Sequence, residues 1–155
     1  MRAWIYRFVS ILGPRYTHGH VFDFTKHLLA EPQRLSVLGD GSQRKSYLHV
    51  SDCIEGVLTG LEKAADPINI FNLGTNETLT VTESLDTICD TLGVNPERVY
   101  TGGERGWPGD IPFISLDCAK IRSLGWKPQY SIRESVVQTV NYLTENKWLL
   151  EDSRP

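Results

Sequence analysis

Residues 1–15 form the stretch MRAWIYRFVSILGPR, and the apolar run inside it decides the fold class. Over residues 3–12 only Arg7 and Ser10 interrupt the apolar side chains, and the run ends before Pro14. A run of this kind is typical of a strand that is buried on both faces inside a parallel sheet. Such a strand needs neighbouring strands and covering helices, so the rest of the sheet must be sought elsewhere.

Further along the chain, helix-like and strand-like segments alternate. The apolar spacing and the turn residues predict helices over residues 20–30, 52–65, 80–92, 117–125 and 131–148, and strands over residues 35–38, 46–50, 68–74 and 98–103. Residues 104–116 have the composition of a loop. The alternation of strands with helices predicts an α/β fold.

Three of the expected helices begin with a capping pattern, in which a capping residue is followed three positions later by glutamate. The pairs are Asp52 with Glu55, Thr80 with Glu83, and Ser131 with Glu134. The helix after Asp52 also carries apolar residues along one face, namely Ile54, Val57, Leu58, Leu61 and Ala65.

The bulk composition bounds the classes of protein. At 155 residues, with 40% hydrophobic and 23% charged residues, the chain has the size and composition of one globular domain. A net charge of -3 argues against nucleic-acid binding, which needs a basic face. No apolar run approaches the length of a membrane-spanning helix, and the N-terminus has no signal-peptide plan. The cysteines are odd in number and widely spaced, at Cys53, Cys89 and Cys118. They are expected to be reduced thiols of a cytoplasmic protein.

Residues 39–52, GDGSQRKSYLHVSD, place two cations directly after a glycine-rich turn. Arg44 and Lys45 beside exposed backbone amides suit a phosphate group. The alternative is a solvated hairpin with surface charges, since basic turns are common. The spacing of the residues leaves both interpretations open.

Residues 102–110, GGERGWPGD, contain three glycines in the spacing of a dinucleotide-binding loop. That pattern needs a helix at its end, which Pro108 and Pro112 oppose. A loop that presents Arg105 and Asp110 is the better interpretation. In such a loop Arg105 suits a phosphate, and Asp110 suits sugar hydroxyls.

The histidines and the known nucleophile motifs give no catalytic centre. His18 and His20 have the spacing of two metal ligands, but Asp23 is the only further ligand nearby in the sequence, so we expect loop or helix-start histidines and no metal. His49, inside an expected strand, is interpreted as structural. No Gly-x-Ser-x-Gly, HExxH or P-loop pattern occurs. The residues alone therefore predict an anion-binding α/β domain without visible catalytic machinery.

Four stretches together resemble one protein family. RFVSILGPR, LSVLGDGSQRKSYLHVSD, INIFNLGTNETLTVTE and GDIPFISLDCAKIRSLGWKP occur here in the order in which nucleotide-sugar epimerases and dehydratases carry similar stretches. These proteins are the extended short-chain dehydrogenases, and UDP-glucose 4-epimerase is the type that the chain resembles most. The resemblance extends from Arg2 to about Trp148.

The resemblance also shows what this sequence does not contain. The family begins with a Rossmann half that carries a glycine fingerprint, a ribose-binding acid and a catalytic Tyr-x-x-x-Lys pair. No tyrosine here is followed four positions later by lysine. The chain thus resembles the C-terminal, substrate-binding portion of an extended short-chain dehydrogenase, lacking most of the Rossmann sheet. We expect residues 1–150 to form a nucleotide-sugar-binding domain whose strands at 3–12 and 68–73 would join that sheet, and residues 151–155 to be a frayed tail.

The family's roles carry over to positions in the first part of the chain. Phe8 matches a position beside the nicotinamide of NAD. Ser10 stands where an asparagine usually lies near the sugar and diphosphate. His20 and Val21 match a helix start whose amides approach the diphosphate.

Further binding roles carry over to later positions. Ser36 and Leu38 match the strand that lies against the uracil ring. Lys45 stands at the usual arginine, with Arg44 beside it. The resemblance also gives Arg105 the role of a second phosphate cation and Asp110 that of a ribose-binding acid.

The resemblance implies the UDP-sugar-binding part of an NAD-dependent epimerase or dehydratase, inactive alone because the Tyr-x-x-x-Lys pair is absent. NAD is the cofactor of the intact family, and we expect none to bind this chain alone. Expected partners are a UDP-sugar, a possible Rossmann-half chain, and further copies in a homodimer or higher oligomer. No nucleic acid or membrane is expected as a partner. The alternative is a non-catalytic oligomeric interaction module or a truncated relic, because unpartnered strands invite self-association.

Overall fold

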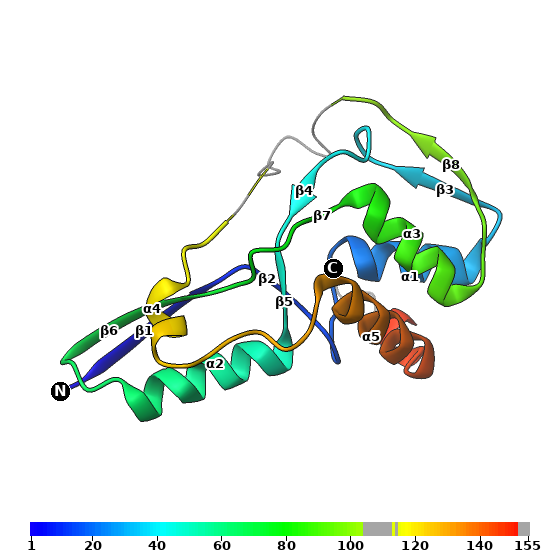
Figure 1. Ribbon diagram of the computed structural model, residues 1–155. Helices are drawn as coiled ribbons and strands as arrows, with labels where there is room; N and C mark the ends of the chain where they lie inside the picture. The colour runs from blue at the N-terminus through cyan, green and yellow to red at the C-terminus, as the bar shows by residue number, and fades with distance from the viewer. Residues whose placement is uncertain (104–112, 114, 152–155) are drawn as a thin grey trace.

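The computed structural model describes residues 1–103, 113 and 115–151 (Figure 1). Its fold is α/β, as predicted. The strands are β1 (Ala3–Phe8), β2 (Ser10–Leu12), β3 (Arg34–Val37), β4 (Arg44–Lys45), β5 (Tyr47–His49), β6 (Ile68–Leu73), β7 (Leu79–Thr80) and β8 (Glu97–Tyr100). The helices are α1 (His20–Ala30), α2 (Val50–Lys63), α3 (Val81–Leu92), α4 (Ala119–Ser123), α5 (Ile132–Glu145) and α6 (Trp148–Glu151).

The predicted strand over residues 3–12 is interrupted at Val9, because its two halves pair with different partners. Strand β1 pairs in parallel with β6, and β2 pairs in parallel with β5. The Val9 N–H still donates to the Leu73 carbonyl over 3.3 Å, whereas the next residue, Ser10, lies opposite Tyr47. The opening segment therefore joins two separate strand pairs.

The sequence predicts that strand β1 is buried on both faces, and this prediction is wrong for the described residues. One face packs on α2, where the Trp4 indole N–H donates to the Gly60 carbonyl and the Tyr6 hydroxyl donates to the Val57 carbonyl. The other face of the β1–β6 pair carries exposed apolar side chains, with Ile5 at 46%. The sheet therefore has a covering helix on one side and an uncovered apolar face on the other within the described residues.

Helix α2 turns its smallest residues toward the sheet. A Cβ added to Gly56 would lie 2.6 Å from Leu73 Cδ2, and one added to Gly60 would lie 3.1 Å from Phe71 Cε2. These glycines let the helix backbone approach the strands closely. Three residues of the apolar face predicted for this helix are exposed instead, namely Ile54, Leu58 and Leu61.

The N-cap of helix α2 also lies three residues earlier than predicted. Its N-cap is His49, whose Nδ1 accepts the Ser51 N–H, so the expected cap role of Asp52 is wrong. Asp52 is buried, and its two carboxylate oxygens accept the main-chain N–H groups of Gln129 at 2.9 Å and Tyr130 at 3.1 Å. The carboxylate thus ties α2 to the segment that leads into α5.

Two larger apolar cores and a small cluster of Phe22, Leu143 and Leu150 hold the described part of the fold together. The larger core lies among α1, α3 and α5 and the strands beside them, and its buried members include Leu12, Val21, Leu35, Leu85, Ile88 and Val136. The smaller core lies among β6, α2 and α4 and includes Val9, Phe71, Leu73, Ile121 and Trp126. Figure 1 shows the β1–β6 pair extending away from the three larger-core helices.

The ends of the helices follow the sequence closely in two places. The capping boxes Thr80–Glu83 and Ser131–Glu134 are both confirmed. The predicted helix over residues 131–148 ends at Glu145 and is followed by α6, while residues 152–155 of the expected frayed tail lie outside the described residues. No helix in the described part of the chain has the length and apolar character needed to cross a membrane.

Replacement of Asp52 by alanine tests the junction between α2 and α5. Asp52→Ala leaves two partly buried N–H groups without an acceptor, so we expect the free energy of unfolding to fall by about 2–4 kcal/mol. Glu55→Ala, an exposed carboxylate on the same helix, should change it by less than about 0.5 kcal/mol. Urea unfolding followed by circular dichroism measures both values. Equal effects of the two substitutions would contradict the assigned role of Asp52.

Candidate functional site

A cavity of about 880 Å³ lies between the junction of β1 and β2, the start of α1, and strands β3 to β5. Among the residues given binding roles by the sequence, those that line it are Phe8, Ser10, His20, Ser36, Leu38 and Lys45. The structure thus brings together six side chains that are up to 37 positions apart in the sequence. Their roles in binding stay predictions.

The other residues expected at the site are placed differently. Val21 is fully buried in the larger core, so only its main chain is available at the start of α1. Arg44 is exposed, and its guanidinium donates to the Thr78 hydroxyl over 3.1 Å. Arg105 and Asp110 lie outside the described residues.

The start of α1 forms one wall of the cavity. Its N-cap residue is Gly19, with φ of +92°, and no side chain caps the helix through a hydrogen bond within the described residues. The first N–H groups of a helix lack partners inside the helix and carry partial positive charge. This wall therefore offers donors to an anionic group.

The imidazole of His20 is held from both sides. Its Nδ1 lies 3.0 Å from the Tyr47 hydroxyl, and its Nε2 lies 2.7 Å from the Ser84 hydroxyl. Two hydroxyls can each donate or accept, so they fix the ring plane. The arrangement connects α1, β5 and α3 at the floor of the cavity.

Acid–base groups also line the cavity near α1. Burial raises the pKa of the Tyr16 hydroxyl to about 12, with a further contribution from the Asp23 carboxylate. Burial raises the pKa of Asp23, while His18 and Lys26 act in the opposite direction. Tyr16 therefore stays protonated at neutral pH and is available as a hydrogen-bond donor rather than as a base. Within the described residues, no group of three or more His, Cys, Asp or Glu side chains is arranged to hold a metal ion.

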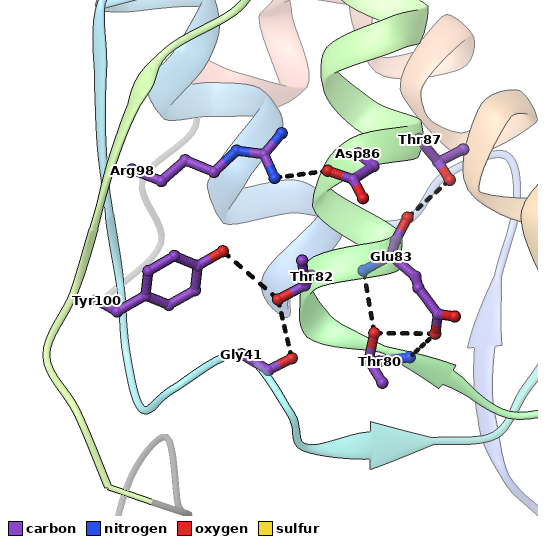
Figure 2. Close-up of polar contacts among 8 residues, drawn as sticks. All are labelled: Gly41, Thr80, Thr82, Glu83, Asp86, Thr87, Arg98 and Tyr100. Atoms are coloured by element: carbon purple, nitrogen blue, oxygen red, sulfur yellow. Dashed lines mark hydrogen bonds and ion pairs between the residues drawn. The ribbon is translucent and has the colours of Figure 1, made fainter.

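The turn before Lys45 is fixed by the start of α3, as Figure 2 shows. The Gly41 carbonyl accepts both the Thr82 N–H and the Thr82 hydroxyl, each over 3.1 Å. The Tyr100 hydroxyl lies 3.4 Å from the same Thr82 oxygen. This arrangement holds the turn at residues 39–41 between α3 and β8.

The capping box of α3 supports the same region (Figure 2). The Thr80 hydroxyl accepts the Glu83 N–H, and the Glu83 carboxylate accepts the Thr80 N–H, which lowers the pKa of Glu83. Thr80 in turn lies opposite Arg44 in the antiparallel β4–β7 pair. Lys45 is therefore carried by a strand that is anchored to a capped helix.

Sequence reasoning missed Gln43 and Tyr47, which both line the cavity. Gln43 is only 4% exposed, and neither polar atom of its amide has a hydrogen-bond partner among the described residues. The available signal was positional, since both residues lie two positions from Lys45 and alternate side chains of a strand share a face.

The comparison with family models settles the relationship. The family model described as GDP-mannose 4,6 dehydratase matches residues 5–139, most of the chain. The chain belongs to this family. Its fold is that of part of an extended short-chain dehydrogenase, as the sequence predicted.

Several members of the extended short-chain dehydrogenases are similar to this chain. A putative UDP-glucose 4-epimerase of Methanocaldococcus jannaschii is 28% identical over 146 residues, which are 92% of this chain and 46% of that protein. A dTDP-glucose 4,6-dehydratase of Xanthomonas campestris is 32% identical over 133 residues, or 80% of this chain and 37% of that protein. The chain thus spans less than half the length of these relatives.

Solved structures of the family have the same fold. The UDP-glucose 4-epimerase of Thermotoga maritima, solved with UDP-glucose, superposes with a TM-score of 0.78 at 29% identity, covering 93% of this chain and 46% of that one. A UDP-galactose 4-epimerase superposes with a TM-score of 0.79 at 29% identity, covering 95% and 47%. Other neighbours in the family, including a UDP-glucose 4-epimerase of Bifidobacterium longum, were solved with NAD.

Substitution of Gly41 tests the anchoring of the turn. Gly41 has φ of +81°, and an added Cβ would lie 2.7 Å from Tyr100 Cε1. Gly102 has φ of +80°, but an added Cβ meets no described atom within 4 Å. We expect Gly102→Ala to lower the free energy of unfolding by about 1 kcal/mol through backbone strain, and Gly41→Ala to lower it by about 2–3 kcal/mol. Urea unfolding measures the difference, and equal losses would show that the turn is not packed against α3 and β8.

Proposed function

We propose that this chain binds a UDP-sugar and is the substrate-binding half of an NAD-dependent epimerase or dehydratase. The observation that carries the proposal is the cavity of about 880 Å³, in which Lys45 and the uncapped start of α1 line the same space. A cation and a helix N-terminus together suit a diphosphate. The similarity to proteins named as epimerases of UDP-sugars supports the choice of ligand.

The positions around the cavity support one orientation of the ligand. The diphosphate lies at Lys45 and the first turn of α1. The nucleoside extends toward Ser36 and Leu38, at the end of β3, and the sugar extends toward Ser10. Arg105 and Asp110, which lie outside the described residues, complete the proposed site as phosphate and ribose ligands.

The proposed half positions its ligand but performs no hydride transfer by itself. The sequence has no Tyr-x-x-x-Lys pair, and the high pKa of Tyr16 makes it a poor base at neutral pH. Phe8, the position that the resemblance places beside the nicotinamide, is 56% exposed, and we propose that this chain alone binds no NAD. No step of catalysis is therefore assigned to this chain alone.

A Rossmann half is the proposed partner of the β1–β6 pair. Parallel sheets are covered on both faces in folded proteins, whereas this pair exposes Ile5, Ile68 and Ile70. In the proposal residues 1–150 form the nucleotide-sugar-binding domain, and β1 and β6 complete a larger sheet with that half. The relatives, which are about twice as long as the matched segment, support the existence of such a half. The three unpaired cysteines agree with a reducing compartment such as the cytoplasm.

Self-association into an oligomeric interaction module is the second candidate function, and one observation favours it. Helix α2 exposes Ile54, Leu58 and Leu61 on the protein surface, in addition to the apolar face of the sheet. Exposed apolar surface of this kind is buried by association. A homodimer or higher oligomer would cover it without a Rossmann half.

The ligand is tested by calorimetric titration of the chain with UDP. We expect binding, with Lys45→Met raising the Kd about ten- to a hundredfold through loss of a charge-assisted hydrogen bond. Lys127→Met, which removes an exposed cation outside the cavity, should leave the Kd unchanged. No heat at millimolar UDP, or equal effects of the two substitutions, would contradict the proposed ligand.

Association is tested by light scattering on the purified chain. We expect a dimer or larger species, because the apolar face of β1–β6 is uncovered. Ile70→Glu places a charge on this face and should shift the chain toward monomer, whereas Glu62→Gln, on the exposed side of α2, should not. A monomeric wild-type chain that binds no apolar dye would contradict the prediction of self-association.

A further inference from the structure

Gln43 lines the cavity, and the hydrogen-bonding capacity of its carboxamide is unused among the described residues. The side chain is 4% exposed, and both Nε2 and Oε1 are buried without a partner there. A buried amide normally has partners, because removing it from water without hydrogen bonds is unfavourable. The unused donor and acceptor therefore point to a ligand group that supplies both.

The backbone keeps Gln43 at this position. Its carbonyl accepts the Val81 N–H over 3.1 Å, at the start of α3. The next residues, Arg44 and Lys45, pair with β7. Among the described residues no hydrogen bond holds the side-chain amide in place.

Three alternate residues of this segment line the cavity one after another. Gln43, Lys45 and Tyr47 all line it, as expected for side chains that share one face of an extended segment. Tyr47 lies opposite Ser10 in the β2–β5 pair, while Gln43 is bonded to the start of α3, beside the turn that follows Leu38. With the diphosphate at Lys45, Ser10 is on the sugar side and Gln43 is on the nucleoside side.

We propose that Gln43 reads the nucleobase of the bound nucleotide, an inference that rests on the proposed function. Its Oε1 accepts the N3–H of uracil, and its Nε2 donates to the neighbouring base carbonyl. A phosphate offers only acceptors and would leave Oε1 without a partner, whereas the imide edge of uracil offers a donor beside an acceptor. Gln43 thus acts as a specificity-determining residue at the nucleoside end of the cavity, where Leu38 offers apolar contact.

The test compares UDP, N3-methyl-UDP and pyrophosphate by calorimetry on the whole chain. We expect Gln43→Met to weaken UDP binding about tenfold, the loss of a hydrogen-bonded contact, and to leave pyrophosphate binding unchanged. The wild-type chain should lose a similar factor on N3-methyl-UDP, and Gln43→Met should no longer distinguish the two nucleotides. Gln33→Met, at an exposed glutamine, is the matched control. Circular dichroism confirms that each variant is folded.

Each other outcome overturns a defined part of the account. If Lys45→Met weakens UDP binding but Gln43→Met does not, the base-reading role is wrong and the proposed ligand stands. If Gln43→Met weakens UDP and pyrophosphate equally, the amide supports the wall of the cavity and does not read the base. If UDP does not bind, or Lys45→Met has no effect on it, the proposed function fails, and the role of Gln43 fails with it.

Discussion

The change of partner at Val9 is the constraint on which the rest of the structure depends. Val9 is 4% exposed and donates its N–H to Leu73, the last residue of β6, before Ser10 begins the pairing with β5. One short segment of backbone therefore belongs to both apolar cores. Because the partners diverge at this point, Phe8 and Ser10 are directed to the cavity between them. Ligands of α/β proteins commonly bind where strands diverge in this way, beyond their carboxyl ends.

The two sides of this junction differ in how completely they are covered. The larger core is enclosed by α1, α3 and α5, and residues such as Val136 and Leu85 have no exposure. The β1–β6 pair has helical cover on one face only, and Ile68 on its other face is 64% exposed. The described residues thus combine a well-enclosed substrate side with an incomplete sheet. This contrast is the physical basis for proposing a ligand at the first and a protein partner at the second.

Sequence reasoning predicted local features and missed those that depend on distant contacts. The capping boxes at Thr80 and Ser131 were predictable because each depends only on the N-cap residue and the glutamate three positions later. Asp52 has the same local pattern, but its carboxylate serves Gln129 and Tyr130, nearly 80 positions away. The break at Val9 was equally hidden, since an apolar run does not reveal how many strands it pairs with.

The candidate site shows the same limit. Lys45 was found because a cation after a glycine turn has a chemical meaning in the sequence itself. Gln43 was missed because an amide acquires meaning only once its burial and lack of partners are known. The short strands β4 and β7 were missed as well, because two-residue strands carry no periodicity. The resemblance to the family indicated which positions bind the ligand. The structure shows that six of them line the same cavity.

The central claim is that the cavity is a preformed ligand site and that the β1–β6 pair is an interface for a Rossmann half. Amide hydrogen exchange of the chain with and without UDP tests this claim most directly. The account predicts that UDP slows exchange in residues 10–12, 19–23 and 43–49, while residues 3–8 and 68–73 exchange at the same rate in both samples. Protection gained mainly in residues 3–8 and 68–73, or no change anywhere at saturating UDP, would contradict it.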